Sequence, residues 1–161
     1  MTTRSDVSPP AGEHAWGGDD WCWACRVLDG TSPGAIVTQT DGVAVLINPL
    51  PLQAGHALIV PRQHVRDLYA LPDVLAGPIL AMAARLARAL KRTVGAEGVT
   101  LRQNNEAASD QHLFHFHLHV IPRFAGDGGR FNAAPQLIGI VEQEAMAVQL
   151  RAALAETAAA R

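Results

Sequence analysis

Short apolar runs separated by turn residues occupy the first third of the chain and predict β-structure there. Residues 34–40 and 43–47 predict two strands, and the Asp-Gly pair between them predicts a hairpin turn. The apolar run 57–60 predicts a third strand, which Pro61 ends because proline has no backbone N–H for a strand partner.

A long helix is predicted in the middle of the chain, because apolar residues recur there at helical spacing. Pro72 and Asp73 mark its start, and Gly95 marks its end. The apolar stripe of this helix consists of Leu75, Ile79, Met82, Leu86 and Leu90.

Two more strands and one more helix are predicted in the second half. Residues 99–103 and 113–122 have the apolar pattern of strands, and residues 142–158 consist largely of good helix formers. The order of strands, helix, strands and helix is not a strict βαβ alternation. It predicts an α+β fold, with an antiparallel sheet and helices on one side.

Composition restricts the class of protein. The chain has 161 residues, of which 48% are hydrophobic, so residues 20–161 can form one domain behind a flexible tail at 1–19. A net charge of −2 argues against a nucleic-acid-binding protein. There is no apolar run of about 18 residues and no signal peptide. Two closely spaced cysteines do not make a disulfide framework, so we expect a cytoplasmic protein without membrane or nucleic-acid partners.

Histidines are concentrated in one predicted strand. His115, His117 and His119 alternate with apolar residues, so they share one strand face while Phe116 and Leu118 share the other. At about 3.3 Å per residue the outer two histidines lie about 13 Å apart, so two neighbours could share a metal ion but all three would reach one ion only from a strongly bent strand. Such a row suits the oxygens of a phosphate chain, because imidazoles supply donors and a nucleophilic nitrogen. A polar face without function is the alternative.

Four segments resemble the histidine triad (HIT) family, in the family's order. Residues 115–121 are similar to its His-φ-His-φ-His-φ-φ signature, where φ is apolar, and Pro-Arg follows as in many members. Residues 55–64 look like the family's Gly-His-x-Leu-φ-φ-Pro-Lys-x-His segment, and residues 104–105 supply its asparagine. Residues 21–25 resemble the Cys-x-x-Cys start of bacterial members. The resemblance covers residues 20–155 and implies a five-stranded antiparallel sheet, a long helix, a C-terminal helix and a homodimer.

The resemblance also implies roles for individual residues. His117 would attack the α-phosphorus of a nucleotide, with its other ring nitrogen bonded to the carbonyl of His115, and His119 would contact the phosphate or bridging oxygen. The implied catalytic set is His56, His115, His117 and His119, and the implied nucleotide-binding set is Asn48, Asn105, Gln111 and His112. Asp110 and His112 depart from the family, which commonly has glycine and a small residue there.

The cysteine pair leaves a metal question open. Cys-x-x-Cys alone is ambiguous between zinc and redox chemistry. The resemblance to bacterial members implies that His64 and His115 complete a structural zinc site with Cys22 and Cys25. Two reduced, buried cysteines are the alternative.

Three functions are therefore considered. The first is a HIT-type hydrolase or transferase that releases AMP from adenine dinucleoside polyphosphates or nucleoside phosphoramidates through a nucleotidyl-histidine on His117. The second is a zinc-dependent hydrolase that uses the His/Cys cluster as ligands. The third is a non-catalytic nucleotide-binding protein.

Overall fold

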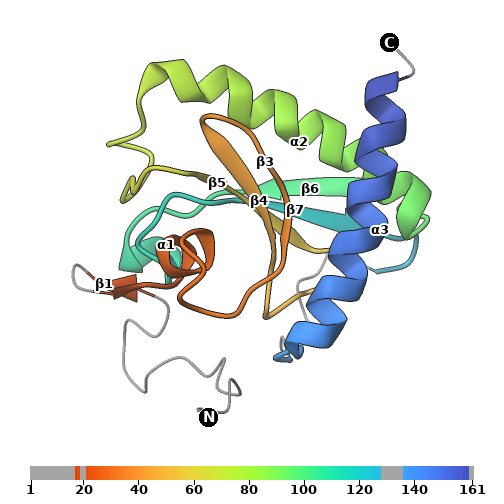
Figure 1. Cartoon of the computed structure of the whole chain (residues 1–161), viewed down its shortest axis with the longest axis horizontal. Helices are drawn as coiled ribbons and strands as arrows, with labels where there is room; N and C mark the ends of the chain where they lie inside the picture. The colour runs from red at the N-terminus through yellow and green to blue at the C-terminus, as the bar shows by residue number, and fades with distance from the viewer. Residues whose placement is uncertain (1–16, 19–20, 128–135, 160–161) are drawn as a thin grey trace.

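An antiparallel sheet of five strands forms the centre of the fold (Figure 1). The computed structural model describes residues 17–18, 21–127 and 136–159. The strand order is β3-β4-β5-β7-β6, and every neighbouring pair is antiparallel. This arrangement confirms the predicted α+β class. The strands are β3 (Ile36–Gln39), β4 (Val43–Ile47), β5 (Ala57–Pro61), β6 (Gly98–Arg102) and β7 (Leu118–Arg123).

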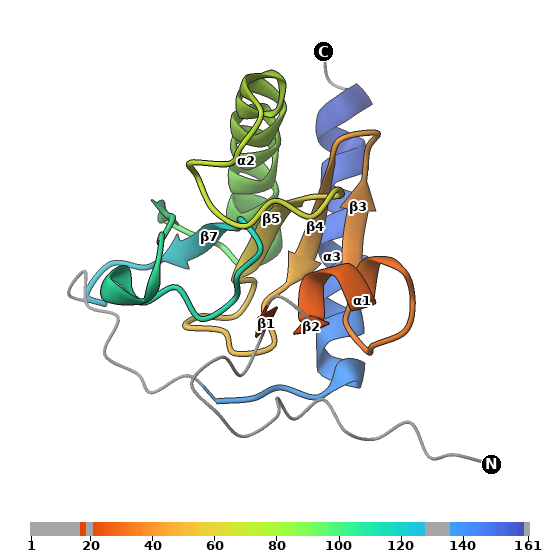
Figure 2. The ribbon, with the colours of Figure 1, turned by 90° about the vertical axis from the view of Figure 1, so that its left-hand side faces the viewer.

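Two long helices cover one face of the sheet (Figures 1 and 2). These are α2 (Asp73–Thr93) and α3 (Ile140–Ala159), which pack against each other and bury the larger apolar core. Alternate residues of β4 point to this core, because successive strand side chains face opposite ways. The predicted start and end of α2 are confirmed, with Pro72 and Val94 as its caps, and α3 begins two residues before the predicted 142.

The opposite face carries a short helix that the sequence pattern did not predict. It is α1 (Trp23–Leu28), which follows the two-stranded pair β1 (Gly17–Gly18) and β2 (Trp21–Cys22). The thiol of Cys22 caps α1 by accepting the N–H of Cys25. Trp23 packs from α1 onto Leu46 and Leu58 of the sheet. The two predicted helices do lie on one side of the sheet, and α1 is an additional helix on the other side.

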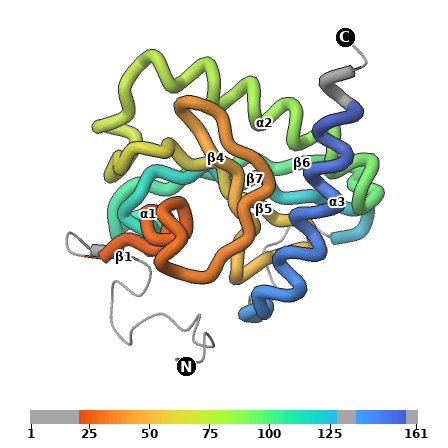
Figure 3. The backbone as a smooth tube through the Cα atoms, viewed as in Figure 1, coloured from red at the N-terminus to blue at the C-terminus, as the bar shows by residue number. Residues whose placement is uncertain are grey.

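The histidine segment is also less regular than predicted. β7 begins at Leu118, whereas the predicted strand began at residue 113. Residues 113–117 leave the sheet because their backbone bonds elsewhere: the N–H of Phe116 donates to the carbonyl of Val65. The chain between β6 and β7 thereby passes close to α1 (Figure 3). Leu113 of this connection packs with Trp23. A short 3-10 helix, η1 (Ala107–Ser109), lies within that connection.

Two expectations concern other parts of the chain. The predicted tail at 1–19 falls almost wholly outside the described residues. Among the described helices, none combines the length and the apolar character needed to cross a bilayer.

Candidate active site

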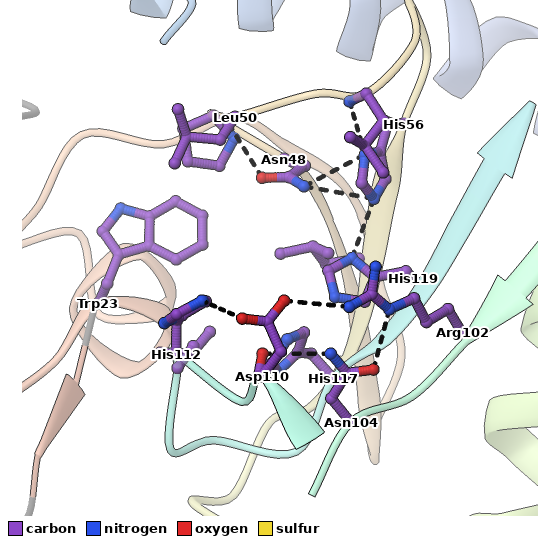
Figure 4. A pocket seen from close by; sticks show the side chains of 14 residues that line it. Trp23, Asn48, Leu50, His56, Arg102, Asn104, Asp110, His112, His117 and His119 are labelled. Atoms are coloured by element: carbon purple, nitrogen blue, oxygen red, sulfur yellow. Dashed lines mark hydrogen bonds and ion pairs between the residues drawn. The ribbon is translucent and has the colours of Figure 1, made fainter. Parts of the chain in front are cut away.

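A pocket of about 330 Å³ lies on the sheet face that carries α1 (Figure 4). Its volume falls within the range of about 300–1,000 Å³ that is usual for small-molecule sites. Part of the wall is apolar, and the remainder carries polar and charged side chains. The lining residues are Trp23, Asn48, Pro49, Leu50, Leu52, His56, Leu58, Arg102, Asn104, Asp110, His112, Leu113, His117 and His119.

Strand register explains why histidine and arginine meet in this pocket. His119 of β7 pairs with Leu58 of β5 on one side and with Arg102 of β6 on the other. Directly paired residues place their side chains on the same face of a sheet. Three strands therefore contribute one side chain each to the pocket floor.

A hydrogen bond to a backbone carbonyl two residues earlier fixes the orientation of the His117 ring. Its Nδ1 lies 2.7 Å from the carbonyl oxygen of His115, and a carbonyl can only accept, so Nδ1 carries the proton. Nε2 is then the unprotonated nitrogen of a side chain that lines the pocket. Burial lowers the pKa of His117, which favours the neutral imidazole. This is the contact that the resemblance implied.

A second pair of histidines forms a directed hydrogen-bond chain. The N–H of Leu52 donates to Nδ1 of His56, 3.1 Å away, so the proton of His56 resides on Nε2. That nitrogen lies 2.9 Å from Nδ1 of His119 and donates to it. His119 must then carry its proton on Nε2. Burial lowers the pKa of His56 to about 3 and that of His119 to about 2, so both rings are neutral near pH 7.

These lowered pKa values predict how stability depends on pH. Because the folded pKa of His56 and of His119 lies below the unfolded value near 6.5, the unfolded chain takes up more protons as the pH falls. The contribution of these two histidines to the free energy of unfolding should be constant above pH 7. As the pH is lowered from 6 to 4, it should fall by about 1.4 kcal/mol per pH unit for each histidine. Urea unfolding at several pH values measures this slope, and His56→Gln should remove one histidine's share. An unchanged slope in that variant would contradict the assignment.

A cluster of metal-ligand type lies on the other side of the histidine segment. Nδ1 of His115 is 3.3 Å from the sulfur of Cys22 and 3.4 Å from that of Cys25, and Nδ1 of His64 is 3.4 Å from Cys25. All four ligand atoms lie within 4.8 Å of one another. The structure thus brings together the four residues that the resemblance implied.

The chemistry of this cluster fits zinc. Zn–S and Zn–N bonds of about 2.3 and 2.0–2.1 Å place sulfur and nitrogen about 3.5 Å apart on a tetrahedron, close to the distances found. Nε2 of His115 donates to the carbonyl of Pro61 at 2.8 Å, which leaves Nδ1 free to ligate, as is usual for metal-bound histidine. Burial raises the pKa of Cys22 to about 12, so an ion would have to displace its proton.

The predicted nucleotide contacts divide into two groups. Asn48 and His112 line the pocket, and the amide nitrogen of Asn48 lies 3.3 Å from Nδ1 of His56. Asn105 and Gln111 are outside the lining. Asn105 accepts the N–H of Leu68, and buried Gln111 donates to two backbone carbonyls, so both hold the surrounding loops.

Comparison with known protein families matches the HIT domain over residues 29–126. The chain belongs to the HIT family. An uncharacterized HIT-like protein of Mycobacterium tuberculosis is 31% identical over 139 residues, which cover 86% of this chain and 96% of that protein. An Arabidopsis thaliana protein named adenylylsulfatase is 30% identical over 102 residues, covering 63% of this chain and 52% of that protein.

A solved HIT structure supports the fold and the metal cluster. It is a zinc-bound histidine triad family protein from Mycobacterium smegmatis, with a TM-score of 0.77 and 30% identity. The match covers 89% of this chain and all of that one.

Sequence reasoning missed most of the apolar lining of this HIT protein and three residues with polar or aromatic side chains, Trp23, Arg102 and Asn104. Arg102 ends an ordinary strand pattern, and its place beside His119 follows only from the register. Asn104 lines the pocket, whereas the predicted residue was Asn105. Trp23 stands between the two cysteines, so the predicted metal motif could have drawn attention to it.

Proposed function

We propose that this HIT protein is a nucleotidyltransferase or hydrolase that transfers an adenylyl group to Nε2 of His117. The adenylyl group then passes to water, and AMP is released. The observation that carries the proposal is the 2.7 Å hydrogen bond from His117 Nδ1 to the His115 carbonyl. It fixes the tautomer whose Nε2 lone pair is available for attack without prior loss of a proton.

The first step forms a bond between Nε2 of His117 and the α-phosphorus, and breaks the bond from phosphorus to the leaving group. The chain from Leu52 through His56 places a proton on Nε2 of His119, so this N–H can donate a hydrogen bond to the leaving group. The leaving group takes its own proton from water, because loss of the proton from neutral His119 would leave an imidazolate. Arg102 and the amide of Asn104 are the further donors available to phosphate oxygens. Water then breaks the Nε2–phosphorus bond.

The nucleoside is assigned to the apolar part of the pocket. Trp23, Leu50 and Leu58 give a flat base an apolar surface, and Asn48 supplies polar atoms for the ribose hydroxyls. Adenine is the proposed base, which is supported by the name of the Arabidopsis relative.

Structural zinc completes the proposal. Cys22, Cys25, His64 and His115 would hold it, and four protein ligands leave no open position for substrate, as in structural sites. The ion would fix α1, and with it Trp23, against the segment that bears His117. The zinc-dependent hydrolase is less favoured because His117 and His119 lie outside the cluster. The homodimer, the cytoplasmic location and the absence of nucleic-acid partners stay predictions.

The test offers the purified protein diadenosine tri- and tetraphosphate, an adenosine 5′-phosphoramidate and adenylyl sulfate, and separates the products by chromatography. We expect AMP release and an adenylyl-labelled protein that survives a denaturing alkaline quench. Brief chelation at a temperature where the fold persists should leave the rate within about twofold. Rapid loss of activity in still-folded protein would favour the metallohydrolase, and AMP binding without turnover of any substrate would favour the binding protein.

A further inference from the structure

Asp110 occupies a backbone position that favours glycine. Its φ and ψ are 68° and 34°, in the left-handed region, where a side chain costs energy unless the residue is glycine or, less readily, asparagine or aspartate. The loop does not need this side chain for its shape. Asn104 donates to the backbone carbonyl of Asp110, and the N–H of Asp110 donates to the carbonyl of Ala107. A carboxylate retained at such a position points to a role in the pocket.

The carboxylate is shared between two pocket residues (Figure 4). One oxygen of Asp110 lies 2.7 Å from Nε2 of His112, and the other lies 3.1 Å from Nη2 of Arg102. Nε of the same guanidinium donates to Asn104. The side chain of Asp110 is 62% exposed and that of Arg102 is 33% exposed, so the carboxylate is the more accessible of the two charges.

This pairing sets the charge that a substrate meets. Among the residues that line the pocket, Arg102 is the sole guanidinium or ammonium group and Asp110 the sole carboxylate. Their charges cancel, and His112 adds a positive charge only when it is protonated. His56 and His119 add none near pH 7, because their pKa values are about 3 and about 2. A pocket built for a polyphosphate chain would hold an excess of cationic groups.

The pair also lies where the leaving group would be. In the proposed binding mode the base lies on the apolar wall at Leu50, the ribose at Asn48 and the α-phosphate at His117. The leaving group then faces the remaining wall of the pocket. Figure 4 shows Arg102 and Asp110 on the side of the pocket opposite Asn48 and Leu50.

We infer that Asp110 is a specificity-determining residue that cancels the charge of Arg102, so that the pocket prefers nucleoside phosphoramidates with neutral or cationic amine leaving groups over anionic leaving groups such as polyphosphate. The inference rests on the proposed nucleotidyl transfer to His117. It narrows the substrates of that reaction to one chemical class.

The test uses adenosine 5′-phosphoramidates that differ only in the far end of a four-carbon N-alkyl chain: an ammonium, a methyl or a carboxylate group. Diadenosine tetraphosphate and adenylyl sulfate provide two further anionic leaving groups. We compare kcat/KM for the wild type, Asp110→Asn and Asp110→Gly. Both replacements tolerate the left-handed backbone, so their melting temperatures should match or exceed that of the wild type.

The wild type should cleave the ammonium and methyl substrates at least tenfold faster than the carboxylate substrate. Either replacement should raise kcat/KM for the anionic substrates about tenfold and change the methyl substrate less than threefold, because it leaves the Arg102 charge uncancelled. Equal ratios of carboxylate to methyl turnover in wild type and variants would overturn the role of Asp110 while leaving nucleotidyl transfer standing. No turnover of any substrate, with no labelled protein, would overturn both.

Discussion

Replacement of His117 by alanine is expected to lower kcat/KM for AMP release by about 10⁴-fold or more, and to abolish labelling of the protein by substrate. The reason is that the variant lacks Nε2 of His117, the unprotonated ring nitrogen that the bond from Nδ1 to the His115 carbonyl leaves available for attack. Steady-state kinetics and labelling after a denaturing alkaline quench measure the two effects.

The matched control for this variant is nucleotide binding. His117 is one of fourteen lining residues, so the affinity for AMP, measured by calorimetry, should stay within about tenfold of the wild type. His117→Gly supplied with free imidazole should recover part of the rate, because a small imidazole can occupy the vacated volume. Full activity in His117→Ala would eliminate the covalent mechanism.

Replacement of Cys25 by serine is expected to remove bound zinc and to destabilise the fold by about 3–5 kcal/mol. The thiol of Cys25 lies near both histidines of the cluster, and metal-binding free energy contributes directly to folding in such sites. Metal analysis gives the zinc content, and urea unfolding gives the free energy. Chelation of the wild type should produce a loss of similar size.

A surface variant far from the cluster controls for differences in zinc content and stability between protein preparations. Val141 on α3 is 82% exposed, and its change to alanine should alter neither zinc content nor stability by more than about 0.5 kcal/mol. One equivalent of zinc retained by Cys25→Ser, with unchanged unfolding, would show that the cluster is not the metal site.

Local signals allowed much of the fold to be predicted from the sequence. The apolar stripe between Pro72 and Gly95 defined α2 to within a residue, because helix periodicity and its end signals are encoded locally. The start of β7 was missed because residues 113–117 keep the alternating pattern, yet the backbone of Phe116 bonds to Val65 instead of a strand. Tertiary hydrogen bonds decided that boundary.

From the residues alone the site was predictable only where the chemistry lay within one segment, and the residues of separate segments were predicted only through the family resemblance. His117 and its bond to the preceding histidine are two residues apart, so a short motif carries the whole arrangement. Arg102 reaches the pocket through pairing across two strands, which a single sequence does not reveal. The same limit applies to Asn104, which faces the pocket while Asn105, one residue later, bonds to Leu68.

The hydrogen-bond chain that ends at His119 has a fixed direction, in which each group donates to the next. It begins at the peptide N–H of Leu52, which cannot give up its proton. No group behind His119 in this chain could therefore replace a proton that His119 lost. Because the rings of His56 and His119 are both neutral, loss of the proton on Nε2 would leave an imidazolate, so His119 keeps its proton and acts as a fixed hydrogen-bond donor. In the proposed reaction the leaving group therefore takes its proton from water, and the two histidines have the same protonation state before and after each half-reaction.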